Sequence, residues 1–256
     1  MIDVTQLKPT WLWVLGEEGP PPPVDRQLKR LFCLTAMTAL SSCAHAVQEK
    51  DPEAEEAIAQ YEYTVGWIKA NAEDELTDWE RKCLSLTPES WGERELMDAS
   101  WKFQAAAIIG WALGLTKWLP AWLSHGPEDF DFVFIESSLD DVRSLVRPIS
   151  KPEIELKNSV TCAWLWRCRD RDWSQPVGFF ARRASQKHLA AFVVELDKSG
   201  QFDPPIRGDF NVEGRPFGSL SEAEANTIRS RSTERLRALN WLVGQQPDYD
   251  EISCDT

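Results

Sequence analysis

The Ser/Thr-x-x-Glu motif, which stands at four expected helix starts, is the feature that most restricts how this 256-residue chain can fold. In such a capping box the first side chain accepts a hydrogen bond from the backbone of the glutamate, whose carboxylate accepts one from the backbone of the first residue. The motif therefore marks the start of a helix. It occurs at Thr77–Glu80, Ser90–Glu93, Ser150–Glu153 and Ser221–Glu224, and helical apolar patterns follow it.

Two further helices are expected ahead of the first motif. Apolar side chains at helical spacing predict one over residues 24–48. Asp51-Pro52 offers an N-cap followed by proline at the first helical position, which predicts a second helix that fades near Ala72. Residues 1–23 are expected to be an extended arm packed on the helices, because the prolines at 20–23 cannot be helical.

Strand signals are scarce, so the predicted fold class is mainly α. The stretch from Trp101 to Leu113 is apolar nearly all round and is expected at the centre of the core. Residues 130–135 could form a short strand, and residues 208–217 alternate around Glu213-Gly214 like a small β-hairpin. No linker divides the sequence, which indicates a single-domain helical globule over residues 1–256.

The chain carries a net charge of −13, with 41 acidic and 28 basic side chains. Nucleic acids and anionic membranes need a basic surface, so neither is an expected partner. A basic protein partner would be attracted by such a field. Acidity alone is equally typical of soluble proteins that have no such partner.

Cysteine and histidine usage predicts no metal site and no cofactor. Six cysteines occur without a Cys-x-x-Cys pair, and the three histidines stand far apart in the sequence. The thiols are expected to be reduced, and the protein to be cytoplasmic. Residues 26–46 resemble a signal peptide, but an acidic leader precedes them and an amphipathic helix explains the same residues. No run of 18 apolar residues predicts a membrane span.

Phosphate-binding loops and nucleophile elbows are absent from the sequence, and the expectation is that the protein is not an enzyme. The strongest catalytic candidate is Glu155-Leu-Lys157 with Asp140 or Asp141 upstream, a spacing similar to that of metal-dependent nucleases. Such centres place the glutamate and lysine on a strand, whereas here the pattern is helical. The alternative interpretation, solvated charges on an amphipathic helix, is favoured.

An acidic zone with aromatic neighbours is the candidate partner-binding surface. It comprises Glu128, Asp129, Phe130, Asp131, Asp140 and Asp141. Acidic and aromatic side chains together suit docking to a basic protein. The alternative is a helix start with acids that complement the helix dipole.

Several strings resemble a known bacterial family, the domain of unknown function 4272. They are residues 100–105, 111–115, 234–242 and 249–256. The resemblance spans nearly the whole chain and implies one domain. It marks as signature residues, with a structural role, Trp101, Trp111, Glu234, Arg235, Asn240, Trp241, Asp250 and Asp255. Leu236 stands where the family often has histidine, so any acid–base role of that imidazole is lost here.

Proteins like this family occur beside secreted bacterial toxins. The resemblance therefore implies an immunity protein that binds a cognate, basic toxin, such as a nuclease effector of a type VI secretion system, and covers its active or nucleic-acid-binding surface. Two alternatives remain open from the sequence: a metal-dependent hydrolase that uses clustered carboxylates, and a non-enzymatic scaffold or regulatory protein.

Overall fold

The computed structural model describes residues 19–117, 119–123, 137–173 and 203–254. Within these ranges the α-helices are α1 (Val24–Gln48), α2 (Ala54–Ala72), α3 (Asp78–Leu84), α4 (Glu93–Ser100), α5 (Lys102–Ala112), α6 (Leu139–Leu145), α7 (Lys151–Trp173) and α9 (Glu222–Leu242). Single 3-10 turns are η2 (Glu73–Glu75), η3 (Pro88–Ser90), η5 (Phe217–Ser219) and η6 (Tyr249–Glu251). The strands are β1 (Asn211–Val212) and β2 (Arg215–Pro216). The predicted mainly α class with a small hairpin is confirmed.

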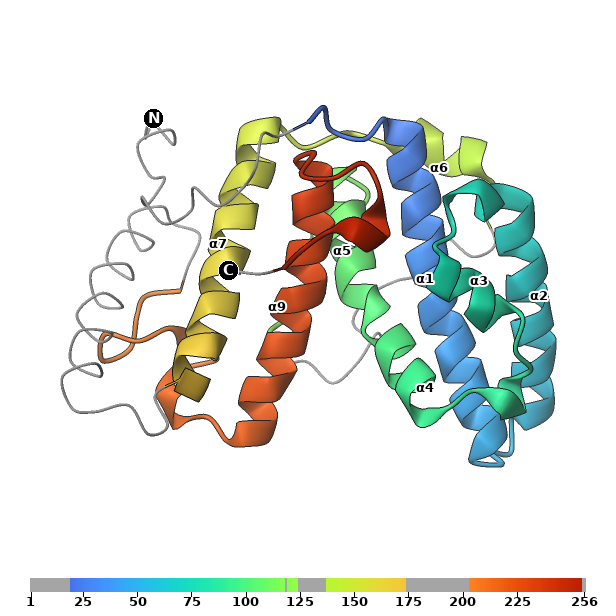
Figure 1. The fold of residues 1–256 in the computed structure, drawn as a ribbon, viewed down its shortest axis with the longest axis horizontal. Helices are drawn as coiled ribbons and strands as arrows, with labels where there is room; N and C mark the ends of the chain where they lie inside the picture. The colour runs from blue at the N-terminus through green and yellow to red at the C-terminus, as the bar shows by residue number, and fades with distance from the viewer. Residues whose placement is uncertain (1–18, 118, 124–136, 174–202, 255–256) are drawn as a thin grey trace.

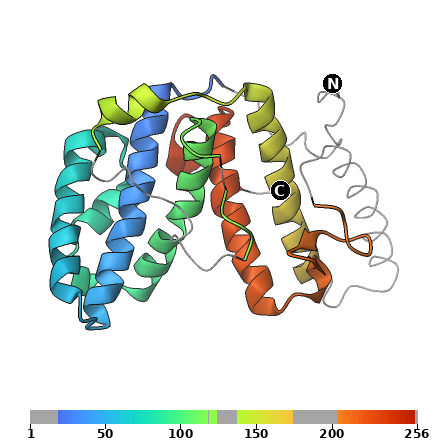
Figure 2. The ribbon, with the colours of Figure 1, turned by 180° about the vertical axis from the view of Figure 1, so that it is seen from behind.

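The longest helices stand side by side in the order α7, α9, α5, α1 and α2 (Figure 1). The view from behind shows the same row reversed, with α6 lying across one end of α1 (Figure 2). The turn η6 and helix α3 lie on the face of the row that is turned toward the viewer in Figure 1. Helix α9, near the end of the chain, lies between α7 and α5. Segments that are distant in the sequence are therefore neighbours in the row.

Two main apolar clusters fill the described part of the molecule. The larger is formed by α1, α2 and α5 together with the second half of α9, including Leu239 and Trp241. The smaller is formed by α7, the hairpin and the first half of α9, including Ile228. Helix α9 thus contributes side chains to both clusters.

Helix α5 lies at the centre of the row, as its sequence predicts. Each of its residues except Trp111 is buried, including the polar Lys102 and Gln104. A helix that is apolar on every face can be covered on every face only between other helices. Its polar side chains must then find partners inside the protein.

Capping chemistry explains three of the predicted helix starts. Thr77 with Glu80, and Ser221 with Glu224, form complete capping boxes at α3 and α9. At α7 the Glu153 carboxylate accepts from the backbone and hydroxyl of Ser150. Helix α1 has the predicted bounds. Helix α2 starts at Ala54, later than predicted.

The predicted start at Ser90–Glu93 is wrong. Ser90 instead completes a capping box with Thr87, which opens the turn η3, and α4 begins at Glu93 after Gly92 without a side-chain cap. The predicted long helix is also divided at Trp101 into α4 and α5. The Ser100 hydroxyl donates to the Met97 carbonyl at 2.7 Å, a local bond that competes with continuation of the helix.

The predicted hairpin is present but short. Asn211 pairs with Pro216 and Val212 with Arg215 in an antiparallel register. Glu213 and Gly214 have φ values of 50° and 84°, the left-handed values that a tight two-residue hairpin turn requires. The strand predicted over residues 130–135 lies outside the described residues.

The described part of the arm docks where α9 ends. The Gly19 amide donates to the Gly244 carbonyl at 2.8 Å, and Pro22 is buried. Gly244, predicted to end α9, has a φ of 86°, and a Cβ there would lie 2.3 Å from the Gly19 oxygen. Only glycine fits both the backbone conformation and the close approach.

Among the described helices, α1 alone has the length and hydropathy needed to cross a membrane. In the structure, 61% of its most apolar window is buried. Its apolar side chains form a large part of the larger core cluster, as those of a central helix in a folded bundle do.

Candidate functional site

The candidate partner-binding residues are only partly described. Glu128, Asp129, Phe130 and Asp131 lie outside the described residues. Asp140 and Asp141 are exposed in the first turn of α6.

Both of these acids take part in local contacts at the start of α6. Ser138 caps the helix by accepting from the Asp141 amide at 3.2 Å, and its hydroxyl lies 2.6 Å from the Asp141 carboxylate. Arg143 pairs with Asp140 at 2.6 Å and with Asp25 of α1 at 2.9 Å. These contacts fit the alternative interpretation of a helix start with complementary acids.

A second acidic surface lies on α2, at one edge of the row (Figure 1). We call it the α2 face; it consists of Glu55, Glu56, Ile58, Glu62 and Tyr63, all exposed. Tyr63 is 49% exposed and Ile58 36%. Their spacing places them on one side of the helix, away from α1. None of the three carboxylates forms an ion pair with a described residue.

Glu155 and Lys157 of the candidate hydrolase motif lie on helix α7, not on a strand, while Asp140 and Asp141 lie on α6. Glu155 pairs with Lys151 at 3.5 Å. The Lys157 ammonium lies 5.8 Å from the ring centre of Trp111, and burial lowers the pKa of Lys157. Among the described residues, no group of three or more His, Cys, Asp or Glu side chains is arranged to hold a metal ion.

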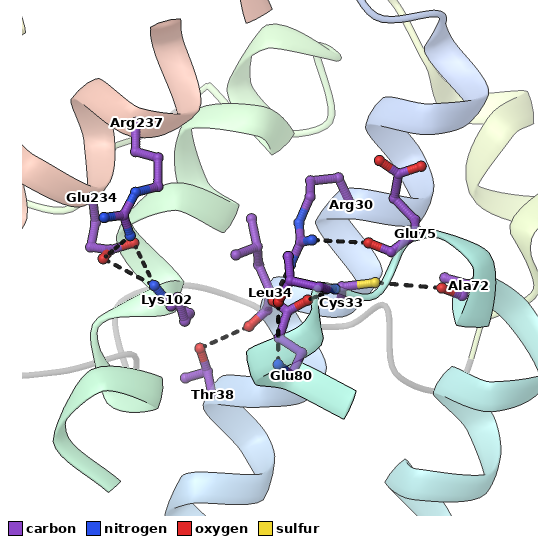
Figure 3. Close-up of polar contacts among 11 residues, drawn as sticks. Arg30, Cys33, Leu34, Thr38, Ala72, Glu75, Glu80, Lys102, Glu234 and Arg237 are labelled. Atoms are coloured by element: carbon purple, nitrogen blue, oxygen red, sulfur yellow. Dashed lines mark hydrogen bonds and ion pairs between the residues drawn. The ribbon is translucent and has the colours of Figure 1, made fainter. Parts of the chain in front are cut away.

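Arg30 of α1 is fully buried and is held by residues of η2 and α3 (Figure 3). Its guanidinium pairs with Glu80 and donates to the Glu75 carbonyl at 3.0 Å. The ring of Tyr249 lies 4.5 Å from the guanidinium carbon. Burial is the largest single effect and lowers the pKa of Arg30, but the charge of Glu80 and its hydrogen bond, together with Cys33 and Tyr249, raise the pKa overall. The arginine thus stays charged in the core and fixes α3 and η6 against α1.

A second buried ion pair joins α5 to α9 (Figure 3). Lys102 binds both carboxylate oxygens of Glu234, which also accepts from Arg237 at 3.0 Å. Asp250 lies near both networks: burial and then Glu80 raise its pKa, while Arg30 and Lys102 oppose this. The positive and negative side chains of this region therefore compensate one another.

The remaining signature residues join α9 to its neighbours. The Asn240 carboxamide accepts from Asn158 of α7 at 2.7 Å and donates to the Ser253 carbonyl at 2.9 Å. Trp241 is fully buried and donates to the Pro247 carbonyl. Trp101 and Trp111 are half-buried, and Asp255 lies outside the described residues.

Arg235 and Lys157 form no ion pair with a carboxylate among the residues that the structure describes. Arg235 is buried, donates to Gln104 at 2.7 Å and to the Pro120 carbonyl, and lies 4.3 Å from the ring centre of Trp122. Burial and then Arg231 lower the pKa of Arg235 to about 9. Arg235 in turn contributes to the lowered pKa of Lys157. We call Gln104, Trp111, Trp122, Lys157 and Arg235 the Arg235 site.

The sequence does contain a signal for some of these interior polar groups. Lys102 and Gln104 interrupt a helix whose other positions are apolar, so both had to be buried with partners. The sequence gives no such signal for Arg30. It stands near other basic residues, and the pattern is equally compatible with a basic side chain on the solvent face of the helix.

The fold and these networks define a mainly α-helical protein whose interior charges hold its helices together. Comparisons with models of protein families, with curated proteins and with solved structures find no match to this chain.

Proposed function

We propose that this chain is an immunity protein that binds and neutralises a cognate bacterial toxin. The partner is a basic protein, specifically a nuclease effector of a type VI secretion system, whose active or nucleic-acid-binding surface the chain covers. The proposal rests on the net charge of −13 and on the resemblance described above.

The observation that carries it is the α2 face. Its three carboxylates are exposed and unpaired with described residues, while Ile58 and Tyr63 add apolar surface between them. A charged rim around exposed aromatic and aliphatic groups is the usual composition of a protein-binding surface. Carboxylates would also pair with the basic side chains with which a nuclease holds phosphates.

The first test is binding to the product of the adjacent gene. Both proteins are co-expressed and purified, and nuclease activity is measured as the chain is added in increasing amounts. We expect a stable complex and stoichiometric inhibition. Absence of a complex with any neighbouring gene product would contradict the proposal.

The second test locates the contact surface. Charge reversal of Glu55, Glu56 and Glu62 to lysine should weaken binding by at least about a hundredfold, because like charges then face the partner. The control reverses three exposed acids on other elements, Glu89, Asp203 and Glu251, with the same change in net charge. It should slow association at low salt but leave the dissociation rate nearly unchanged. Equal effects of the two triple variants on dissociation would exclude the α2 face as the contact.

A further inference from the structure

Arg235 is a buried cation whose described partners are all neutral. Its Nε donates to the Gln104 carboxamide oxygen, its Nη2 donates to the Pro120 carbonyl, and Trp122 covers one face of the guanidinium. No carboxylate among the described residues forms an ion pair with it. Elsewhere in the interior, Arg30, Lys102 and Arg167 are each paired with an acid. An uncompensated buried charge is costly and calls for a counter-ion.

Lys157 of α7 is a second cation in the neighbourhood of Arg235. Its ammonium forms no hydrogen bond or ion pair with a described residue and lies beside the Trp111 ring. It is close enough to Arg235 that the guanidinium lowers its pKa further, after burial. Two like charges close together in a chain of net charge −13 raise the cost of leaving either of them uncompensated.

Gln104 supplies an independent sign of a missing partner. Its side chain is fully buried, and its Nε2 has no hydrogen-bond acceptor. The amide orientation is fixed, because its oxygen accepts from Arg235. A buried amide nitrogen without an acceptor destabilises the folded protein.

We propose that Gln104, Lys157 and Arg235 bind a small oxyanion, a carboxylate or a phosphate group carried by a small molecule. Three adjacent helices, α5, α7 and α9, contribute one donor each. Guanidinium and ammonium groups together with a neutral amide are the donors that such anions bind. Lys157, Trp111 and Trp122 are half-buried, whereas Gln104 and Arg235 are buried, so the first three side chains lie nearer to solvent.

Calorimetric titration at constant ionic strength tests the site directly, with inorganic phosphate in one arm and acetate in the other. Saturable heat with either anion supports the proposal and identifies the preferred group. Thermal unfolding provides a second measurement, since a bound anion raises the midpoint with its concentration. Absence of saturable heat with both anions would overturn the proposal.

Three variants make the test specific to these residues. Lys157→Met should weaken anion binding about tenfold or more, as loss of a charged donor does. The matched control Lys151→Met, on the same helix with its side chain half-exposed, should bind as the natural protein does. Equal binding by the Lys157 and Lys151 variants would also overturn the proposal.

Gln104→Glu should also abolish anion binding, but by placing a negative charge of the protein itself beside Arg235. The new carboxylate lies within hydrogen-bonding distance of Arg235 and supplies the missing negative charge. We expect anion binding to be lost while the midpoint of thermal unfolding rises. A variant that folds, binds phosphate or acetate unchanged and gains no stability would count against the site.

Discussion

Lys102 and Glu234 form an ion pair between the centre of the bundle and its last helix, with the ammonium 3.0 and 3.1 Å from the two carboxylate oxygens. Only 10% and 11% of these side chains are exposed. They are 132 positions apart in the sequence, so the pair forms only once α5 and α9 have packed. A lysine in an apolar helix is tolerated at this position because the carboxylate meets it there.

Removal of this carboxylate should be strongly destabilising. Glu234→Ala leaves the Lys102 ammonium buried without its partner, and we expect the free energy of unfolding in urea to fall by about 3 kcal/mol. Glu155→Ala, which removes a more exposed pair with Lys151, should change it by about 0.5 kcal/mol or less. Similar losses for the two variants would show that the buried pair contributes little.

Two glycines should respond to alanine in opposite directions. Gly244→Ala forces a side chain into a left-handed backbone and against the Gly19 carbonyl, so we expect a loss of about 2 kcal/mol or more. Gly66 lies within α2, where an added Cβ meets nothing within 4 Å, and Gly66→Ala should gain about 0.5–1 kcal/mol. Chemical denaturation of both variants measures the difference, and a stabilised Gly244 variant would contradict the docking of the arm.

Asp209 should make stability depend on pH in the acid range. Burial alone would raise its pKa, but two hydrogen bonds of 2.9 Å from Arg167, together with the Gly218 and Phe210 amides, lower it below the ordinary value. The unfolded chain therefore binds this proton more readily than the folded one. The stabilisation is complete above pH of about 4 and is lost as the pH falls through the folded-state pKa.

Asp209→Asn removes this contribution. The difference in unfolding free energy between the natural protein and the variant should be largest near neutral pH and shrink below pH of about 4. Asp203→Asn, at an exposed position six residues away, should leave the pH dependence unchanged. A constant difference between the natural protein and Asp209→Asn from neutral to acid pH would show that this carboxylate does not titrate abnormally.

The six thiols should differ widely in reactivity. Cys43 and Cys254 are half-buried, whereas Cys33, Cys83, Cys162 and Cys168 are buried. Burial raises the pKa of Cys83 and of Cys162 to about 11, which leaves almost no thiolate near pH 8. An aromatic disulfide reagent should therefore modify Cys43 and Cys254 first and the others only in denaturant. Rapid modification of all six thiols in the folded protein would contradict this packing.

Local signals in the sequence were sufficient for much of the fold. The bounds of α1 follow from the prolines before it and its apolar spacing, and the turn at Glu213-Gly214 follows from the glycine, which adopts positive φ without strain. The start of α4 could not be predicted in this way, because Ser90 belongs to two overlapping capping motifs, Thr87–Ser90 and Ser90–Glu93, and only the first one forms. Such a competition is decided by how Trp91 and Pro88 pack, which is a tertiary effect.

The pairing of the interior charges could not be predicted from the sequence for a related reason. The sequence shows that Glu234 and Arg235 are adjacent, but not that they face different helices and meet Lys102 and Gln104 respectively. Helical geometry turns neighbouring side chains about 100° apart, so one of them can be paired with a lysine while the next remains uncompensated. Only the order of the helices in the row shows which of the two adjacent side chains has a charged partner.

Because α9 supplies side chains to both apolar clusters, neither cluster has a complete interior without it. A fragment that ends before α9 would lack Leu239 from one cluster and Ile228 from the other, and both clusters would be partly exposed to water. In the intact protein, the two clusters should therefore unfold together in one cooperative transition. A substitution that disrupts one half of α9 should therefore also destabilise the cluster that packs on its other half.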